Sequence, residues 1–112
     1  MPIVTSPAEL GQAALTVADQ TLHTVPALTV TTVRNIRLAN TTAAERRATV
    51  YQVPSGGSAG LDRVIIPNMA IPPYGVLDDD GIHTMEEGAQ LIANADDVGV
   101  TITVSGAKTV TS

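Results

Sequence analysis

The sequence predicts an all-β fold, a small antiparallel β-sandwich that is jelly-roll-like, with residues 1–112 as a single domain. Thr, Val and Ile supply 15, 13 and 8 of the 112 residues, and β-branched side chains favour pleated strands over helices. Seven prolines and nine glycines divide the chain at short intervals, as the turns of sandwiches and barrels do. A compact chain of this mass should expose about 5,800 Å² of surface.

The clearest strand covers residues 98–104, where Val and Ile alternate strictly with Gly and Thr. A period of two is typical of a strand with one buried face. Residues 89–93 form a second strand, and the polar residues 94–97 lie between the two. We therefore expect a β-hairpin at this place.

A second hairpin is expected from a long strand over residues 30–39 and a returning strand over residues 47–53, joined by a turn at residues 40–45. Leu38-Ala39-Asn40 and Ile92-Ala93-Asn94 lie 54 residues apart, as do Thr49-Val50 and Thr103-Val104. This similarity indicates either shared turn chemistry or a faint internal repeat.

Proline and glycine define the middle of the chain. Residues 54–60 are a flexible loop by composition. Residues 61–66 and 67–73 are expected to be short edge strands, because proline cannot donate within a central ladder. The acidic run Asp78-Asp79-Asp80-Gly81 predicts a turn, after which residues 82–85 begin the next strand.

Residues 6–17 support two interpretations. Ser6-Pro7-Ala8-Glu9 has the form of a helical capping box, and apolar residues follow at helical spacing. Gly11 and the Thr-rich stretch beyond it favour an extended segment instead. We expect the extended form.

Charge and composition exclude several classes of protein. The formal net charge is −5 and no three basic residues are consecutive, which argues against binding to a nucleic-acid backbone. The absence of cysteine excludes disulfides and thiolate metal sites. The N-terminus has no basic start and no apolar core of a signal peptide, and no apolar run reaches the roughly 20 residues of a membrane span. We therefore expect synthesis in the cytoplasm and no membrane partner.

Two histidines and an acidic run are the candidate metal ligands. His23 and His83 fall in separate predicted strands, whereas a zinc site needs three or four suitable ligands. Asp78, Asp79 and Asp80 are consecutive, and the twelfth residue from Asp78 is Ala89, so the calcium-loop pattern fails. We assign no metal site; a solvated turn is the main interpretation, and weak cation binding is the alternative.

Catalytic patterns are also missing from the sequence. Glu86 and Glu87 are adjacent before a glycine, so they do not face each other across a cleft. Ser55, Ser58 and Ser105 lie in small-residue segments with no nucleophile elbow. We therefore predict that the chain is not an enzyme and assign no catalytic residue and no cofactor.

The chain has two aromatic residues, Tyr51 and Tyr74. Modules that bind sugars or single-stranded nucleic acids stack their ligands on aromatic platforms, and this chain can build at most one small platform. We expect Tyr51 to pack on a sheet face and Tyr74, after two prolines, to be exposed at a loop tip.

Six segments together resemble small structural proteins of tailed bacteriophages, over roughly residues 10–107. They are Leu10-Gly11-Gln12, Leu22 to Pro26, Val33 to Thr42, Val50 to Gly57, and Met85 to Leu91 with Val104 to Gly106 at the close. The family often has an aromatic residue where His23 stands. The motifs are strand and turn patterns, and they carry over no functional residue.

The resemblance implies a virion protein that acts through protein–protein contacts, most simply as a capsid cement or decoration protein. Its partners would be further copies of itself, with a trimer favoured, and other virion proteins such as the major capsid protein. Residues 1–9 and 108–112 are short, mostly uncharged and β-prone, so we expect docking arms there, with frayed ends as the alternative. A fibre or tail accessory part, or a receptor- or glycan-binding sandwich, is the alternative function.

Overall fold

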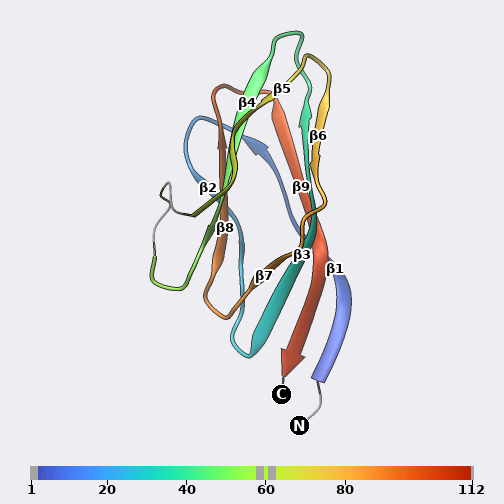
Figure 1. Ribbon diagram of the computed structural model, residues 1–112, viewed down its shortest axis with the longest axis vertical. Coiled ribbons are helices and arrows are strands. Elements are labelled where there is room, and N and C mark those ends of the chain that lie inside the picture. Colours follow the sequence, from blue (N-terminus) through green and yellow to red (C-terminus); the bar gives the residue numbers. More distant parts are fainter. Residues whose placement is uncertain (1–2, 58–59, 61–62, 112) are drawn as a thin grey trace.

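The computed structural model describes residues 3–57, 60 and 63–111, which form two antiparallel sheets packed face to face (Figure 1). The strands in chain order are β1 (Ile3–Leu15), β2 (Gln20–Thr24), β3 (Thr29–Asn40), β4 (Arg46–Val53), β5 (Val64–Ile71), β6 (Val76–Asp79), β7 (His83–Met85), β8 (Gln90–Ala95) and β9 (Val100–Thr111). Within the described ranges no helix is long and apolar enough to cross a bilayer. The exposed surface is 5859 Å², as the scaling relation predicts.

The strand order confirms the predicted sandwich. Sheet I has the order β1-β9-β3-β6, with β7 also paired to β3, and sheet II has the order β2-β8-β4-β5. β6 and β7 pair with successive stretches of β3, so they fill one position together. Four positions in each sheet, connected in this order, are the double Greek key of a jelly roll.

Both predicted hairpins are wrong in the same way. β8 and β9 lie in different sheets, as do β3 and β4; the true partners are β3 with β9 and β4 with β8. The polar connections cross from one sheet to the other. Alternation alone cannot detect this, because paired strands and facing strands both direct their apolar residues into the same core. The two similar segments both precede a connection that crosses between the sheets, but their burial is opposite: Asn40 is buried, whereas Asn94 is half-buried.

The core lies between the sheets, where the alternating residues of every long strand meet. Val100, Ile102 and Val104 are fully buried, whereas Val98 lies before β9 and is 60% exposed. On β3, Val33, Ile36 and Leu38 are equally buried. The same cluster contains residues from sheet II: Ala48, Val50, Ile66, Ile71, Leu91, Ala93 and Ala95.

Residues 6–15 belong to β1, so the extended interpretation is confirmed. β1 pairs with β9 from Ile3 opposite Thr111 to Leu15 opposite Val100, with a bulge at Leu10. The bulge accompanies the burial of Leu10. Gly11 follows, and a side chain there would come within 2.7 Å of the Leu22 carbonyl oxygen. β1 and β2 therefore close one side of the sandwich.

Three further boundaries differ from expectation. Asp78 and Asp79 belong to β6 rather than to a turn, because their backbones pair with Arg37 and Ile36. Val64–Ile71 is one edge strand that contains Pro67, and residues 61 and 62 lie outside the described residues. The expected arms at residues 3–9 and 108–111 pair with each other as the ends of β1 and β9, while residues 1, 2 and 112 lie outside the described part.

Gly106 permits a close approach in the middle of sheet I. A Cβ atom at this position would overlap the Thr32 carbonyl oxygen on β3, and this backbone is held by the ladder on both sides. We expect Gly106→Ala to lower the free energy of unfolding by about 1–3 kcal/mol. Urea unfolding followed by circular dichroism measures the loss, with Ala107→Ser as the neighbouring control. Equal stability of both variants would contradict the close approach.

Candidate interaction surfaces

The three consecutive aspartates lie at the end of β6 and directly after it. Asp78 pairs with Arg37, whose Nε lies 2.8 Å from its Oδ1. Asp79 Oδ2 lies 3.0 Å from His83 Nε2, and its Oδ1 accepts the Gly81 amide. Asp80 accepts a hydrogen bond from the side chain of Asn35 at 2.8 Å. Each carboxylate thus has its own partner.

The electrostatics of Asp78 agree with this structural role. A hydrogen bond from the Arg37 guanidinium, strengthened by its charge, holds the pKa of Asp78 below its usual range. The same contact raises the pKa of Arg37. Both side chains border solvent, so the pair contributes little to stability. Among the residues that the structure describes, no three His, Cys, Asp or Glu side chains are grouped to hold a metal ion.

The two histidines lie at separate places in the sandwich. His23 Nε2 lies 3.1 Å from the Thr31 hydroxyl oxygen, at the junction of β2 with sheet I. Burial lowers the pKa of His23, and the positive charge of Lys108 lowers it further, while a hydrogen bond to the Leu10 carbonyl opposes the shift. His23 therefore joins β2 to sheet I in surroundings that disfavour its charged form.

The serine and glutamate residues considered for catalysis lie in separate parts of the sandwich. Ser55 is exposed in the loop after β4, Ser105 is half-buried on β9, and Ser58 lies outside the described residues. Glu86 and Glu87 are exposed, and Glu87 Oε1 accepts the Leu28 amide at 3.0 Å. This carboxylate fixes the connection from β2 to β3 rather than facing a second acid.

The tyrosines lie where the sequence placed them. Tyr51 is half-buried and pairs directly with Ile92 on the outer face of sheet II. Tyr74 is 72% exposed in the connection from β5 to β6 and has a left-handed backbone, with φ of 53°. Tyr74 is therefore a ready contact residue.

Four connections meet at one end of the sandwich, opposite the chain termini (Figure 1). We call this surface the loop end; it comprises residues 16–19, 41–45, 72–75 and 96–99.

The hub of the loop end is Asn40, which is 3% exposed. The two N–H groups of the Asn40 side chain are shared among three carbonyl oxygens, of Ala44 (2.7 Å), Ile71 (3.1 Å) and Pro72 (3.1 Å). Its oxygen accepts from the amide and the hydroxyl of Thr42.

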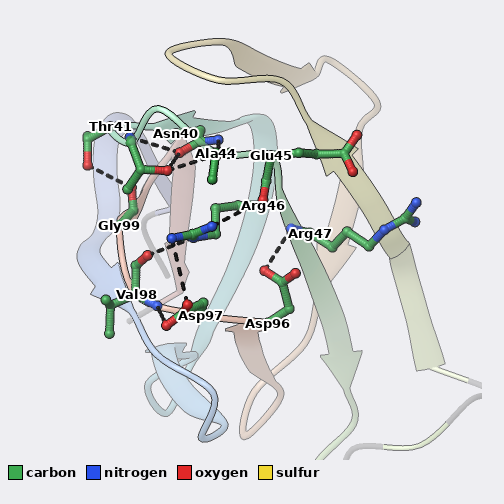
Figure 2. Close-up of polar contacts among 11 residues, drawn as sticks. Asn40, Thr41, Ala44, Glu45, Arg46, Arg47, Asp96, Asp97, Val98 and Gly99 are labelled. Carbon is green, nitrogen blue, oxygen red and sulfur yellow. Dashed lines mark hydrogen bonds and ion pairs between the residues drawn. The ribbon is translucent and has the colours of Figure 1, made fainter.

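Further polar contacts join the loops to one another (Figure 2). The Thr41 amide and hydroxyl both donate to the Gly99 carbonyl at 2.8 Å. Arg46 donates from Nε to the Val98 carbonyl at 3.0 Å and lies near Asp97. The Arg47 amide donates to Asp96 at 2.9 Å. The connections β3–β4 and β8–β9 are therefore locked together by directional bonds.

The loop end presents large apolar side chains to solvent. Val17, Tyr74 and Val98 are 70%, 72% and 60% exposed, and they come from three different connections. Exposed apolar side chains on loops held by a rigid scaffold are typical of contact surfaces. No sequence motif marked Val17 or Val98 in advance, although an isolated Asn after an alternating apolar strand could have marked Asn40.

A groove with a cavity volume of about 230 Å³ opens between the edge strands of the two sheets. It is lined by Ile65, Ile66, Pro67, Met69, Leu77, Asp78 and Asp79. This is the side of the sandwich opposite the contact between β1 and β2. Met69 is 43% exposed there, so the groove is open to solvent and is not an enclosed pocket.

Loss of the Asn40 side chain should destabilise the whole protein. Asn40→Ala removes the buried bond to the Ile71 carbonyl and the acceptor of both Thr42 bonds, which should cost about 2–4 kcal/mol of unfolding free energy. Thr41→Val removes one exposed hydroxyl while the backbone bond to Gly99 remains, so it should cost under about 1 kcal/mol. Chemical denaturation of both variants measures the difference. Similar losses would show that Asn40 is not the hub.

The stability of the protein should fall in mild acid. Because the pKa of His23 in the folded protein lies below its ordinary value of 6.5, the unfolded chain binds more protons as the pH drops through that value. The free energy of unfolding should therefore decrease from pH 7 to pH 5, and His23→Gln should reduce this slope. Denaturation measured at several pH values tests this prediction, with His83→Gln as the control variant. A His23→Gln slope equal to that of the wild type would contradict the role of His23 in the pH dependence.

Comparison with known proteins leaves the family open. No family model matches the sequence, and no curated protein matches it. Among solved structures, a chain from "Structure of infectious bursal disease virus Gt strain" is similar at a TM-score of 0.41 and 11% sequence identity. The alignment covers 98% of this chain and 30% of that chain, so this protein spans less than a third of its neighbour's length.

Proposed function

We propose that this chain is a structural protein of a virion that acts through protein–protein contacts, and within that class a capsid cement protein of a tailed bacteriophage. The observation that carries the proposal is the loop end. Three large apolar side chains, Val17, Tyr74 and Val98, are held exposed there by loops that are bonded to one another. A surface built in this way is pre-organised for a protein partner, because little ordering entropy is lost on binding.

The placement of the polar side chains supports a binding role over a chemical one. Asp78, Asp79 and Asp80 are each engaged by a neighbour from the same sheet. His23 connects the sheets, and Glu87 fixes a backbone amide. Side chains that form such bonds within the sandwich stabilise its fold.

A cement protein works mechanically. It binds across neighbouring capsid subunits and adds buried interface, so that internal pressure must break these contacts as well. The partners of this chain would be the major capsid protein and further copies of itself, in a trimer. The sandwich supplies rigidity, and the loop end supplies the contact with the shell.

The proposal predicts attachment to particles through the loop end. Particles of a phage from which the encoding gene has been deleted are mixed with purified protein, and the temperature of DNA release is measured. Wild-type protein should sediment with the particles and raise that temperature. The double variant Val17→Ser, Val98→Ser should do neither, because it removes apolar contact area.

Pro54→Ser is the control, since Pro54 is exposed in a loop away from the loop end. It should behave as the wild type. Protein that does not sediment with the particles, or a double variant as active as the wild type, would count against the proposed function.

Receptor or glycan binding is the second candidate, and Tyr74 is the observation that favours it. The ring is 72% exposed and aromatic faces stack on sugars. In that case Tyr74→Ala should abolish binding of the purified chain to host cells, while Val17→Ser and Val98→Ser leave it unchanged.

A further inference from the structure

The four outer edges of the two sheets, one of which β6 and β7 form together, differ in how well they are protected from pairing with another chain. β2 has five residues and a bulge, β6 has four residues that end in two aspartates, and β5 contains Pro67 and a left-handed Asn68 with φ of 43°. Short, charged, irregular or proline-containing edges resist strand addition. β1 has thirteen residues and contains Pro7, but its first four residues, Ile3 to Ser6, include no proline, no bulge and no charged side chain.

The second half of β1 is covered by its own molecule. The Gln20 side chain donates to the Ala14 carbonyl at 3.3 Å, and Gly11 lies against the backbone of Leu22. Among the residues that the structure describes, the first half, residues 3–9, pairs with β9 alone. Its outer edge has no neighbouring strand among the described residues.

Pro7 fixes which backbone groups point outward. Pro7 pairs with Ala107 in the β1–β9 ladder, yet proline has no N–H, so its nitrogen faces away from β9. No register shift occurs between Ile3 and Glu9, and backbone direction alternates along a strand. Ile3 and Thr5 therefore direct their N–H and C=O groups outward as well.

We propose that this edge, Ile3 to Ser6, pairs antiparallel with the same edge of a second copy of the chain. The two copies are related by a two-fold axis, and their sheets I join into one continuous sheet. The inference rests on the proposed function, namely action through protein–protein contacts, and names one of those contacts. An isologous contact of this kind can coexist with a trimer contact in a dihedral assembly.

Charge and composition argue for a second copy as the occupant. The chain carries a net charge of −5, which opposes close approach of two copies over most of the surface. The edge from Ile3 to Ala8 has no charged residue, so self-pairing brings no like charges together there. Ile3, Val4 and Thr5 are β-branched residues that favour strands, and identical strands can pair antiparallel about a two-fold axis.

Thr5→Pro is the sharpest test, because it removes an outward N–H and leaves the ladder with β9 intact. Thr5→Val is the matched control, since it keeps the backbone donor. Sedimentation equilibrium over a dilution series gives the mass of each protein, and thermal unfolding by circular dichroism confirms the fold. We expect the dissociation constant of the two-fold contact to rise about tenfold or more in Thr5→Pro and to stay unchanged in Thr5→Val.

A cross-linking measurement covers the case in which Thr5→Pro fails to fold. The chain has no cysteine, so Ile3→Cys, Val4→Cys, Thr5→Cys and Ser6→Cys each introduce a single thiol. Paired strands bring such thiols within disulfide distance, and at least one variant should form a covalent dimer on air oxidation. Ala70→Cys, on the edge strand β5, should stay monomeric under the same conditions.

The possible results separate this inference from the proposed function. If the wild type associates but Thr5→Pro associates equally and no edge cysteine cross-links, the β1 contact is overturned while assembly through another face stands. A wild type that is monomeric at every concentration also overturns it, and the particle-binding experiment then decides the proposed function alone.

Discussion

The architecture depends on one buried carboxamide, that of Asn40. The connections β3–β4 and β5–β6 both cross from one sheet to the other, and the Asn40 amide bonds to carbonyls at both: Ala44 at the first, Ile71 and Pro72 at the second. The contact with the Ile71 carbonyl is buried, so its loss would be costly. Because one side chain bonds to both connections, the crossings β3–β4 and β5–β6 are fixed relative to each other. The positions of the exposed Val98 and Tyr74 follow from this, because Gly99 and Tyr74 bond to the adjacent Thr41 and Thr42.

The sequence allowed the fold class to be predicted because alternation is a local property. Val100, Ile102 and Val104 are buried as their period of two required. Pairing is not local, and the apolar face of β8 looks the same whether it continues the sheet of β9 or faces it across the core. Sequence distance favoured a hairpin, yet the short polar connections cross between sheets. The boundary at Asp78 was missed for a related reason: its ladder partner, Arg37, is 41 residues away.

Of the exposed apolar residues at the loop end, the sequence predicted only Tyr74, whose residue type is informative by itself. Tyr74 stood out as an aromatic residue between proline and glycine, and it is exposed. Val17 and Val98 resemble core residues in a one-dimensional pattern, and only the position of the connections shows that they face solvent. The residue types that suggest sites, the aspartates and histidines, instead bond to neighbouring side chains of the sandwich.

The open outer edge of residues 3–9 and the closed β1–β2 side of the sandwich both result from the way β1 pairs with β9. Bulges at Leu10 on β1 and Arg34 on β3 flank the same residue of β9, Ser105. A bulge changes the direction of a strand and its side-chain parity. Beyond the bulge, β1 approaches β2 closely enough to require Gly11. Before it, β1 follows β9 away from β2, and its outer edge therefore has no neighbour in the described part of its own chain. The bulge at Leu10, which accompanies closure of the core, thus leaves the outer edge of residues 3–9 available to another molecule.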